Sequence, residues 1–354
     1  MGGDGAGILP ITISGEVVAS VAWHVPCWRM RAMRGDVSTL RPGDRVSAYL
    51  IELQLGAGGM GWVFRARHQL DGNVVALKVL RDDQLSVDRA VDRMMREAAI
   101  LASIRHDGVP KFYECGMLPD GRPWIAMELV EGRPLSETIQ RGSMSADDVI
   151  ELVDSVAGVL AAAHDRGVTH RDLKPDNVFL TPGLAYPVRV IDWGIAHHLA
   201  GTRYTDINEA IGTPTYMAPE QARGGSPHGT CDVYGLGVVA YHALAGRPPF
   251  VGGSAIEILV QHLNRPVPPL APRCPNVPIG LIELVERMLI KPVETRPTAP
   301  EVRAATQKLK TNAVAISDTA RISLGYLDGV PSQLDDHTGA TASLRAPHLV
   351  KTGA

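Results

Sequence analysis

Residues 170–177 read HRDLKPDN, and this octapeptide decides how the rest of the chain is interpreted. Six of its eight side chains are polar, and such a density of polar groups is not a core-packing pattern. Asp172 can orient a hydroxyl group and accept its proton, Lys174 can neutralise charge on a transferred group, and Asn177 offers a neutral oxygen to a metal ion. The segment therefore indicates a catalytic loop.

A second acidic position follows 20 residues after Asp172, at the end of a strand-like run. Residues 188–191 read VRVI and lead directly into Asp192-Trp193-Gly194. A carboxylate at a strand end suits Mg²⁺, which prefers hard oxygen ligands and keeps several waters while it bridges phosphates. We therefore expect Asn177 and Asp192 to be the metal ligands, with Mg²⁺ or Mn²⁺ as the ion.

Upstream, residues 56–61 read GAGGMG and match the pattern G-x-G-x-x-G. Residues 62–67 then alternate with period two and meet the turn signal Asp71-Gly72, so the glycines join two strands and do not open a helix. Backbone N–H groups of such a loop can approach phosphate oxygens closely, although the pattern alone also fits an ordinary flexible hairpin. The residues expected to bind nucleotide phosphates are Gly56, Ala57, Gly58, Gly59, Met60 and Gly61.

A lysine and then a glutamate follow the glycine run, and together they could hold a phosphate group. Residues 75–78 read VALK and place Lys78 on the same sheet as the glycine loop. Such a point charge can hold phosphate oxygens if an acid fixes its position. Glu97 supplies that acid, because it adjoins Ala98 on the apolar stripe of a helix and so faces the sheet. A solvated surface position is the alternative for each residue taken alone.

In this order the motifs resemble those of protein kinases of the eukaryotic type, and most closely the bacterial serine/threonine branch, over about residues 45–310. The resemblance implies that Lys78 pairs with Glu97 and holds the α- and β-phosphates of ATP. It also implies that Asp172 is the catalytic base, and that Asn177 and Asp192 hold the metal. Lys174, two residues after the aspartate, is typical of the serine/threonine branch.

The resemblance extends to GTPTYMAPE at residues 212–220, which is similar to a serine/threonine substrate-docking segment. It implies that Thr213 contacts Asp172 and Lys174, and that Glu220 forms a buried ion pair with Arg296. Trp193 departs from the usual Asp-Phe-Gly and is expected to fill the same apolar slot. By the same resemblance, the adenine pocket has a roof of Leu55, Val63 and Ala76, a floor of Phe179, a gate at Met127 and hinge backbone from Glu128 to Val130.

The expected fold is α+β: a two-lobed protein-kinase-like fold with a small antiparallel β-sheet lobe that carries one helix, and a larger, mainly helical lobe. We place the small lobe at 44–127, the hinge at 128–132 and the large lobe at 133–310. Strands are expected at 47–55, 62–68, 73–80, 111–118 and 124–129, a helix from Val87, and a helix capped by Ser145 with Asp148 as its capping partner. Asp232 is expected to cap a later helix and brace the 170–172 backbone.

Both ends of the chain are expected to lie outside this domain. Residues 1–43 are glycine-rich at their start and lack a sustained period, so we expect a flexible leader. An internal translation start at Met30 or Met33 is a hypothesis that would remove most of it. Residues 311–354, rich in Thr, Ser, Gly and Asp, are expected to be a flexible tail.

Composition narrows the class of partner. The 354 residues carry a formal charge of −3, so no overall basic field indicates a nucleic-acid partner. The four cysteines form no C-x-x-C pair, which fits a reducing cytosol. No stretch reaches the ~18 uncharged apolar residues that a membrane-spanning helix needs. We therefore expect a cytoplasmic protein with no membrane span.

The expected function is a serine/threonine protein kinase that transfers the γ-phosphate of ATP to hydroxyls of protein substrates. A nucleotide-binding scaffold, a dinucleotide oxidoreductase and a small-molecule kinase are the alternatives. The intact catalytic residues argue against the scaffold, and the strand after Gly61 argues against the oxidoreductase. The docking segment at 212–220 favours protein substrates over small molecules.

Regulation is expected at the segment between Asp192 and Glu220. Arg171 directly precedes the catalytic aspartate, and the resemblance implies that it meets a phosphate on this segment. Thr202 and Thr205 are the candidate hydroxyls, so we predict self-association and autophosphorylation in trans at one of them. The alternative is that Arg171 binds a local carboxylate.

Overall fold

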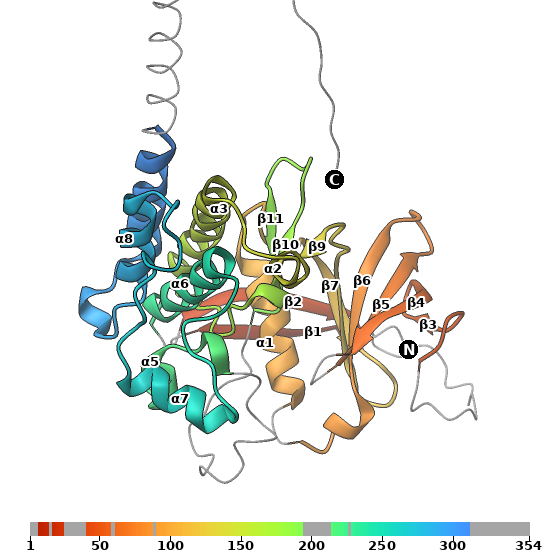
Figure 1. Cartoon of the computed structure of the whole chain (residues 1–354). Helices are drawn as coiled ribbons and strands as arrows, with labels where there is room; N and C mark the ends of the chain where they lie inside the picture. Colours follow the sequence, from red (N-terminus) through yellow and green to blue (C-terminus); the bar gives the residue numbers. More distant parts are fainter. Residues whose placement is uncertain are drawn as a thin grey trace, which may run out of the picture. The chain divides into compact units, whose positions relative to one another are not determined.

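The computed structural model describes residues 6–13, 16–24, 40–57, 61–87, 90–193, 214–225 and 228–311. The described residues between 40 and 311 form the two-lobed α+β fold that the sequence predicts, with the sheet of the small lobe on one side and the helices of the large lobe on the other (Figure 1). The predicted tail at 311–354 lies outside the described residues except for residue 311.

The small lobe is a six-stranded antiparallel sheet in the order β3-β4-β5-β6-β8-β7. All five strands expected from the sequence are present. Their bounds, with those of the short β3 and the lobe's one α-helix, are β3 (Arg45–Val46), β4 (Tyr49–Ala57), β5 (Gly61–His68), β6 (Val74–Leu80), α1 (Ala90–Ser103), β7 (Phe112–Met117) and β8 (Pro123–Glu128). A 3-10 turn, η1 (Asp82–Gln84), precedes α1.

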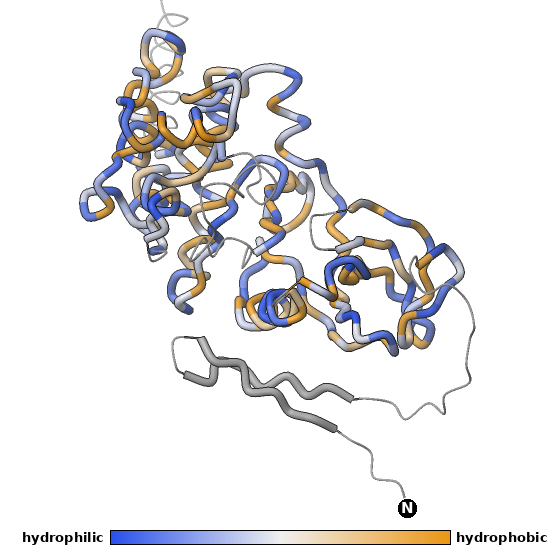
Figure 2. Tube along the Cα trace, turned by 90° about the horizontal axis from the view of Figure 1, so that it is seen from below, coloured by the Kyte–Doolittle hydropathy of each residue, from blue (hydrophilic) through white to orange (hydrophobic). Residues whose placement is uncertain are grey.

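Two apolar clusters hold this lobe together, one on each face of the sheet. One includes Ile51, Phe64 and Leu77, and the other packs Met94 and Ala98 of α1 against the sheet. The predicted helical stripe is therefore confirmed from Val91 onward. Val87 is the exception, because it lies before the helix and is 40% exposed. Figure 2 shows hydrophobic positions recurring along the chain in both lobes.

The large lobe is built on α3, α6 and α8, whose buried faces form one continuous core. Its helices are α2 (Leu135–Gln140), α3 (Ala146–His164), α5 (Pro219–Ala222), α6 (Thr230–Ala245), α7 (Ala255–Asn264), α8 (Ile279–Met288) and a helix over 299–311. Short strands and 3-10 turns join them: β9 (Arg133–Pro134), η2 (Pro175–Asn177), β10 (Val178–Leu180), β11 (Val188–Val190), η4 (Pro214–Tyr216) and η5 (Val293–Thr295).

The start of α3 confirms the predicted capping pair. The Ser145 hydroxyl accepts a hydrogen bond from the Asp148 backbone N–H at 3.1 Å and donates one to the Asp148 carboxylate at 2.6 Å. These bonds satisfy backbone donors that the first helical turn leaves open. The helix is consequently fixed at the end far from the catalytic loop, which follows its other end.

The N-terminal segment differs from the expectation of a leader without regular structure. β1 (Ala6–Ile13) and β2 (Glu16–His24) pair as an antiparallel hairpin. The β-branched residues Ile11, Ile13, Val17 and Val18 favour extended backbone, and the glycines around them masked this signal. Met30 and Met33 lie outside the described residues.

No helix in the described ranges has the length and hydrophobicity to span a membrane.

The predicted pair between Glu220 and Arg296 is present and is built into the large-lobe core. The Arg296 guanidinium donates to both carboxylate oxygens of Glu220, at 2.5 and 3.1 Å. It also donates to the backbone oxygens of Thr230, Ile290 and Lys291. The Arg296 side chain is fully buried and that of Glu220 is 11% exposed, so water contributes little to the solvation of either charge.

We predict that Arg296→Ala lowers the free energy of unfolding by about 3–5 kcal/mol, because it leaves the Glu220 carboxylate buried without its partner. Urea denaturation measures this loss. Arg303→Ala is the matched control, since Arg303 is 45% exposed and its Nε lies 3.9 Å from Asp154. That change should cost about 1 kcal/mol or less. Equal losses in the two variants would contradict the assignment of the pair as a brace.

Candidate active site

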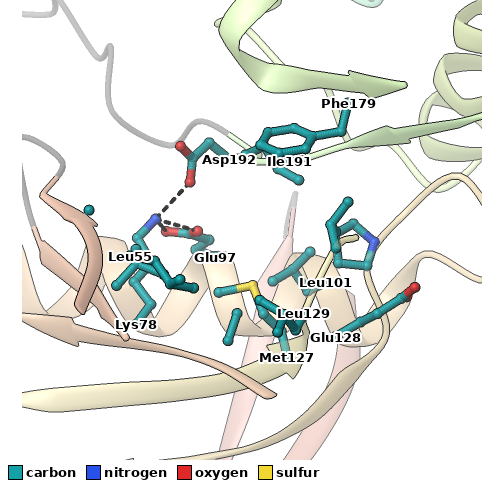
Figure 3. A pocket seen from close by; sticks show the side chains of 15 residues that line it. Leu55, Lys78, Glu97, Leu101, Met127, Glu128, Leu129, Phe179, Ile191 and Asp192 are labelled. Atoms are coloured by element: carbon teal, nitrogen blue, oxygen red, sulfur yellow. Dashed lines mark hydrogen bonds and ion pairs between the residues drawn. The ribbon is translucent and has the colours of Figure 1, made fainter. Parts of the chain in front are cut away.

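A cavity of about 380 Å³ lies between the two lobes. It is lined by residues of β4, β5, β6, α1, β8 and β10, by the two residues that follow β8, by the two that follow β11, and by one residue before β7 (Figure 3). The lining residues are Leu55, Gly56, Val63, Ala76, Lys78, Glu97, Leu101, Pro110, Met127, Glu128, Leu129, Val130, Phe179, Ile191 and Asp192.

The structure brings together every residue predicted for an adenine pocket. Figure 3 shows Phe179 on the large-lobe side, across the cavity from Leu55 and Met127. The sequence did not single out Pro110 and Ile191 as lining residues. Ile191 could have been found from its place beside Asp192, whereas nothing in the sequence around Pro110 marks it as part of the cavity.

The glycine segment joins β4 to β5 as a hairpin, as the sequence predicts. Ala57 and Trp62 are paired across it, and Gly58, Gly59 and Met60 lie outside the described residues. Gly56 lines the cavity, whereas Ala57 is exposed and does not. A Cβ atom at Gly61 would lie 2.8 Å from the Val79 backbone oxygen, so only glycine fits where β5 begins.

Three charged side chains meet at the inner wall of the cavity. The Lys78 ammonium donates to both Glu97 oxygens, at 2.7 and 2.9 Å, and to Asp192 at 3.0 Å. Burial alone would lower the pKa of Lys78, but the two carboxylates outweigh burial and hold that pKa above its ordinary value. The same ammonium is the main cause of the lowered pKa of Asp192. The site therefore holds one cation between two anions.

The catalytic loop forms a second polar cluster. The Lys174 ammonium donates to the Asp172 carboxylate at 2.8 Å. The Asn177 amide N–H₂ donates to the Asp172 backbone oxygen at 2.8 Å and to its carboxylate at 3.2 Å. The Ile191 backbone N–H in turn donates to the Asn177 backbone oxygen at 2.9 Å, which places Asp192 beside this loop.

The Asp232 carboxylate of α6 holds the backbone of the catalytic loop by hydrogen bonds. Its two carboxylate oxygens accept from the backbone N–H groups of His170 and Arg171, each at 2.7 Å, and one also lies 2.8 Å from His164 Nε2. The predicted brace is thus confirmed. The predicted cap is wrong, because α6 begins at Thr230 and the Asp232 carboxylate faces the loop. Arg171 has φ = +68°, a strained conformation that these bonds stabilise.

Trp193 fills the apolar slot expected for it. It is 1% exposed, and its ring centroid lies 4.9 Å from that of His170. Its indole N–H donates to the Val190 backbone oxygen at 3.0 Å, so the polar group that distinguishes Trp from Phe is satisfied within β11 and its flank. Leu101 belongs to the same apolar cluster, and Phe112 packs against it. Thr213 lies outside the described residues.

The donor set fits a divalent cation of the magnesium type. Asn177 uses its amide N–H₂ within the loop and so keeps its carbonyl oxygen for a ligand, and the Asp192 side chain is 53% exposed. Within the described part of the chain, no three His, Cys, Asp or Glu side chains gather as a metal cage. Mg²⁺ is commonly held by one or two protein oxygens together with substrate phosphates and water, which matches this arrangement.

Comparison with known proteins gives the same family at the levels of sequence and fold. The protein kinase domain matches residues 49–306. Serine/threonine-protein kinase pkn3 of Myxococcus xanthus is 36% identical over 273 residues, which cover 75% of this chain and 50% of that protein. PknA of Mycobacterium tuberculosis is 35% identical over 248 residues, which cover 69% of this chain and 56% of that protein. The chain thus spans about half the length of these curated relatives.

A solved structure of a protein kinase domain has the same fold. The crystal structure of the Mycobacterium tuberculosis PknI kinase domain superimposes with a TM-score of 0.61 at 26% sequence identity. The match covers 76% of this chain and 99% of that one.

We predict that Lys78→Met raises the pKa of Asp192, because the ammonium that chiefly lowers it is removed. Carboxylate titration followed by NMR of the labelled protein measures this shift. The sign follows from charge: the ammonium keeps Asp192 ionised to a lower pH than an ordinary aspartate, and the variant should protonate at a higher pH than the wild type. Lys111→Met, at an exposed position, is the control and should leave Asp192 unchanged. An unshifted pKa in Lys78→Met would contradict the ion pair.

Proposed function

This chain belongs to the protein kinase family, and we propose that it transfers the γ-phosphate of ATP to serine and threonine hydroxyls of proteins. The observation that carries the proposal is the contact of Lys78 with both Glu97 and Asp192 at the inner wall of the interlobe cavity. A lysine held in this way is pre-positioned for phosphate oxygens. Relatives at 35–36% identity that are named serine/threonine-protein kinases support the choice of substrate class.

We assign the adenine base to the apolar end of the cavity, between Leu55, Val63 and Ala76 on one side and Phe179 on the other. Met127 lies at its inner end, and the chain from Glu128 to Val130 forms its edge. The phosphates then extend toward Lys78 and the glycine hairpin that begins at Gly56. This orientation follows from polarity, because Lys78, Glu97 and Asp192 meet at one end of the lining, whereas the Glu128 carboxylate at the other end is paired with Arg189.

The transfer itself needs a hydroxyl nucleophile, a place for its proton and stabilisation of the phosphoryl group. The hydroxyl oxygen forms a bond to the γ-phosphorus while the bond from that phosphorus to the β–γ bridging oxygen breaks, and ADP leaves. Asp172 accepts the hydroxyl proton, and Lys174, 2.8 Å from it, neutralises charge on the transferred group. A divalent cation held by Asn177 and Asp192 supplies charge neutralisation for the phosphates when bound. We propose that Thr213 contacts Asp172 and Lys174.

The rival functions differ in what the described residues support. A dinucleotide oxidoreductase needs a helix after the glycine run, and β5 follows it instead. A scaffold without turnover does not need Asp172, Lys174 and Asn177 hydrogen-bonded to one another. A small-molecule kinase does not need the docking segment, whose end at Glu220 is fixed to Arg296.

We propose the domain limits as the sequence places them: small lobe 44–127, hinge 128–132 and large lobe 133–310, with a leader at 1–43 and a tail at 311–354. The described cysteines Cys115, Cys231 and Cys274 are free and buried, as in a reducing compartment. A cytoplasmic location stays a prediction.

We predict that Asp172→Asn lowers phosphoryl transfer by about 10²- to 10⁴-fold, because the amide cannot accept the hydroxyl proton. The assay incubates the full chain with labelled ATP, Mg²⁺ and dephosphorylated casein, and maps the modified residues. Asp176→Asn is the matched control, since Asp176 is an exposed acid in the same loop. Phosphoserine or phosphothreonine formed equally well by both variants would overturn the proposed function.

Autophosphorylation is the regulatory part of the proposal. The Arg171 guanidinium has a buried Nε without a hydrogen-bond partner among the described residues. A buried guanidinium nitrogen without a partner is costly, and a phosphate with about −1.5 to −2 charges is a strong acceptor for it. The candidate hydroxyls, Thr202 and Thr205, lie outside the described residues.

We predict that incubation with ATP places phosphate on Thr202 or Thr205, in trans between two copies, and that this raises activity. Mass spectrometry and casein kinetics compare the wild type with the Thr202→Ala/Thr205→Ala double variant, which should stay at the basal rate. Ser143→Ala removes an exposed hydroxyl outside the segment and serves as the control. Full activation of the double variant, or no phosphate on this segment, would refute the idea.

A further inference from the structure

One buried histidine of α7 contacts the backbone of the docking segment. The His262 Nε2 lies 3.0 Å from the Thr215 backbone oxygen in η4, and its Nδ1 lies 2.9 Å from the Tyr234 hydroxyl of α6. A carbonyl oxygen can only accept, so Nε2 carries the proton and donates to Thr215. Nδ1 is then an acceptor, and the Tyr234 O–H donates to it. Both ring nitrogens are therefore fully used.

The ring is held in place from the sides as well. His262 is fully buried and makes edge-on contacts with Tyr234 at a centroid distance of 5.6 Å and with Phe250 at 4.8 Å. Burial lowers the pKa of His262 to about 4, so the ring is neutral at pH 7, as its hydrogen bonds require. The Arg296 guanidinium lies 5.0 Å from the Tyr234 ring, which links this contact to the buried pair with Glu220.

The segment that His262 contacts and the catalytic loop both pack against the same short stretch of α6. A Cβ atom at Gly235 would lie 3.4 Å from the Leu173 side chain and 3.5 Å from the Tyr216 backbone oxygen. Leu173 follows the catalytic base, and Tyr216 follows Thr215. The close packing at Gly235 therefore sets the spacing between loop and segment, and the bond from His262 prevents the segment from moving away.

We propose that His262 is a positioning residue for protein substrates, which holds the 214–216 segment at a fixed distance from the catalytic loop. This inference rests on the proposed function, because the segment must dock a protein for its position to matter. His262 lies outside the lining of the nucleotide cavity. Its loss should therefore affect the use of protein substrate and leave ATP binding unchanged.

The test compares His262→Leu, His262→Gln and Tyr234→Phe with the wild-type full chain, using casein as acceptor. We expect His262→Leu to raise the KM for casein by about tenfold while the KM for ATP stays within about twofold. Glutamine should restore most of the loss, because its N–H₂ can donate to Thr215 while its carbonyl oxygen accepts from Tyr234. Tyr234→Phe should raise the KM for casein by about threefold, because it loosens the ring without removing its bond to Thr215.

Tyr241→Phe separates positioning from stability. Tyr241 is also a fully buried residue of α6, and its hydroxyl accepts a hydrogen bond from Arg273 at 2.6 Å. Its loss should lower Tm about as much as Tyr234→Phe and leave the KM for casein unchanged. If His262→Leu does not fold, Tyr234→Phe and His262→Gln decide the question.

The inference is overturned if His262→Leu or Tyr234→Phe keeps the wild-type KM for casein, if the KM for ATP rises in parallel, or if Tyr241→Phe gives the same change. A wild-type chain that transfers phosphate to casein with these outcomes leaves the proposed function standing and removes the role of His262. A wild-type chain that transfers none overturns both.

Discussion

The hydrogen bonds of one buried carboxylate hold the catalytic loop in place. Asp232 is 1% exposed and accepts from two consecutive backbone N–H groups, those of His170 and Arg171. Burial alone would raise its pKa, but its hydrogen bond to His164 and those from the loop keep that pKa below the ordinary value. The carboxylate therefore stays ionised, and a charged acceptor makes the stronger bonds that a residue at positive φ requires.

Helix α6 carries this carboxylate, and it also organises the docking segment. Tyr234 and Gly235 lie within one turn of Asp232, and they contact His262 and the backbone around Tyr216. The catalytic loop and the docking segment are thus both positioned by the same buried helix. A shift of α6 would move the loop and the segment together, so the distance between them would be preserved.

Whether an interaction could be predicted from the sequence depends on whether its partners lie close together in the chain or belong to a recognised motif. The Ser145 cap was predictable because it follows from a local spacing at the start of a helix, and the Lys78–Glu97 pair was predictable because the resemblance to protein kinases implies it. For Asp232 the sequence predicted the contact with the 170–172 backbone but also a helix cap that is absent, since its partners come from a segment about 60 residues away. Pro110 in the cavity and His262 under the docking segment were not predictable, because only the packing of distant elements gives them their neighbours.

The charges at the cavity wall explain why cation and nucleotide binding should be coupled. Lys78 is one positive charge between Glu97 and Asp192, so the three groups together carry one net negative charge. A bare polyanionic nucleotide would meet repulsion from Asp192, which is half exposed toward the cavity. In the proposed function, a nucleotide that arrives with a divalent cation would turn that carboxylate from a repulsive group into a ligand. The same carboxylate that restrains Lys78 in the free protein would thereby make productive binding depend on the metal.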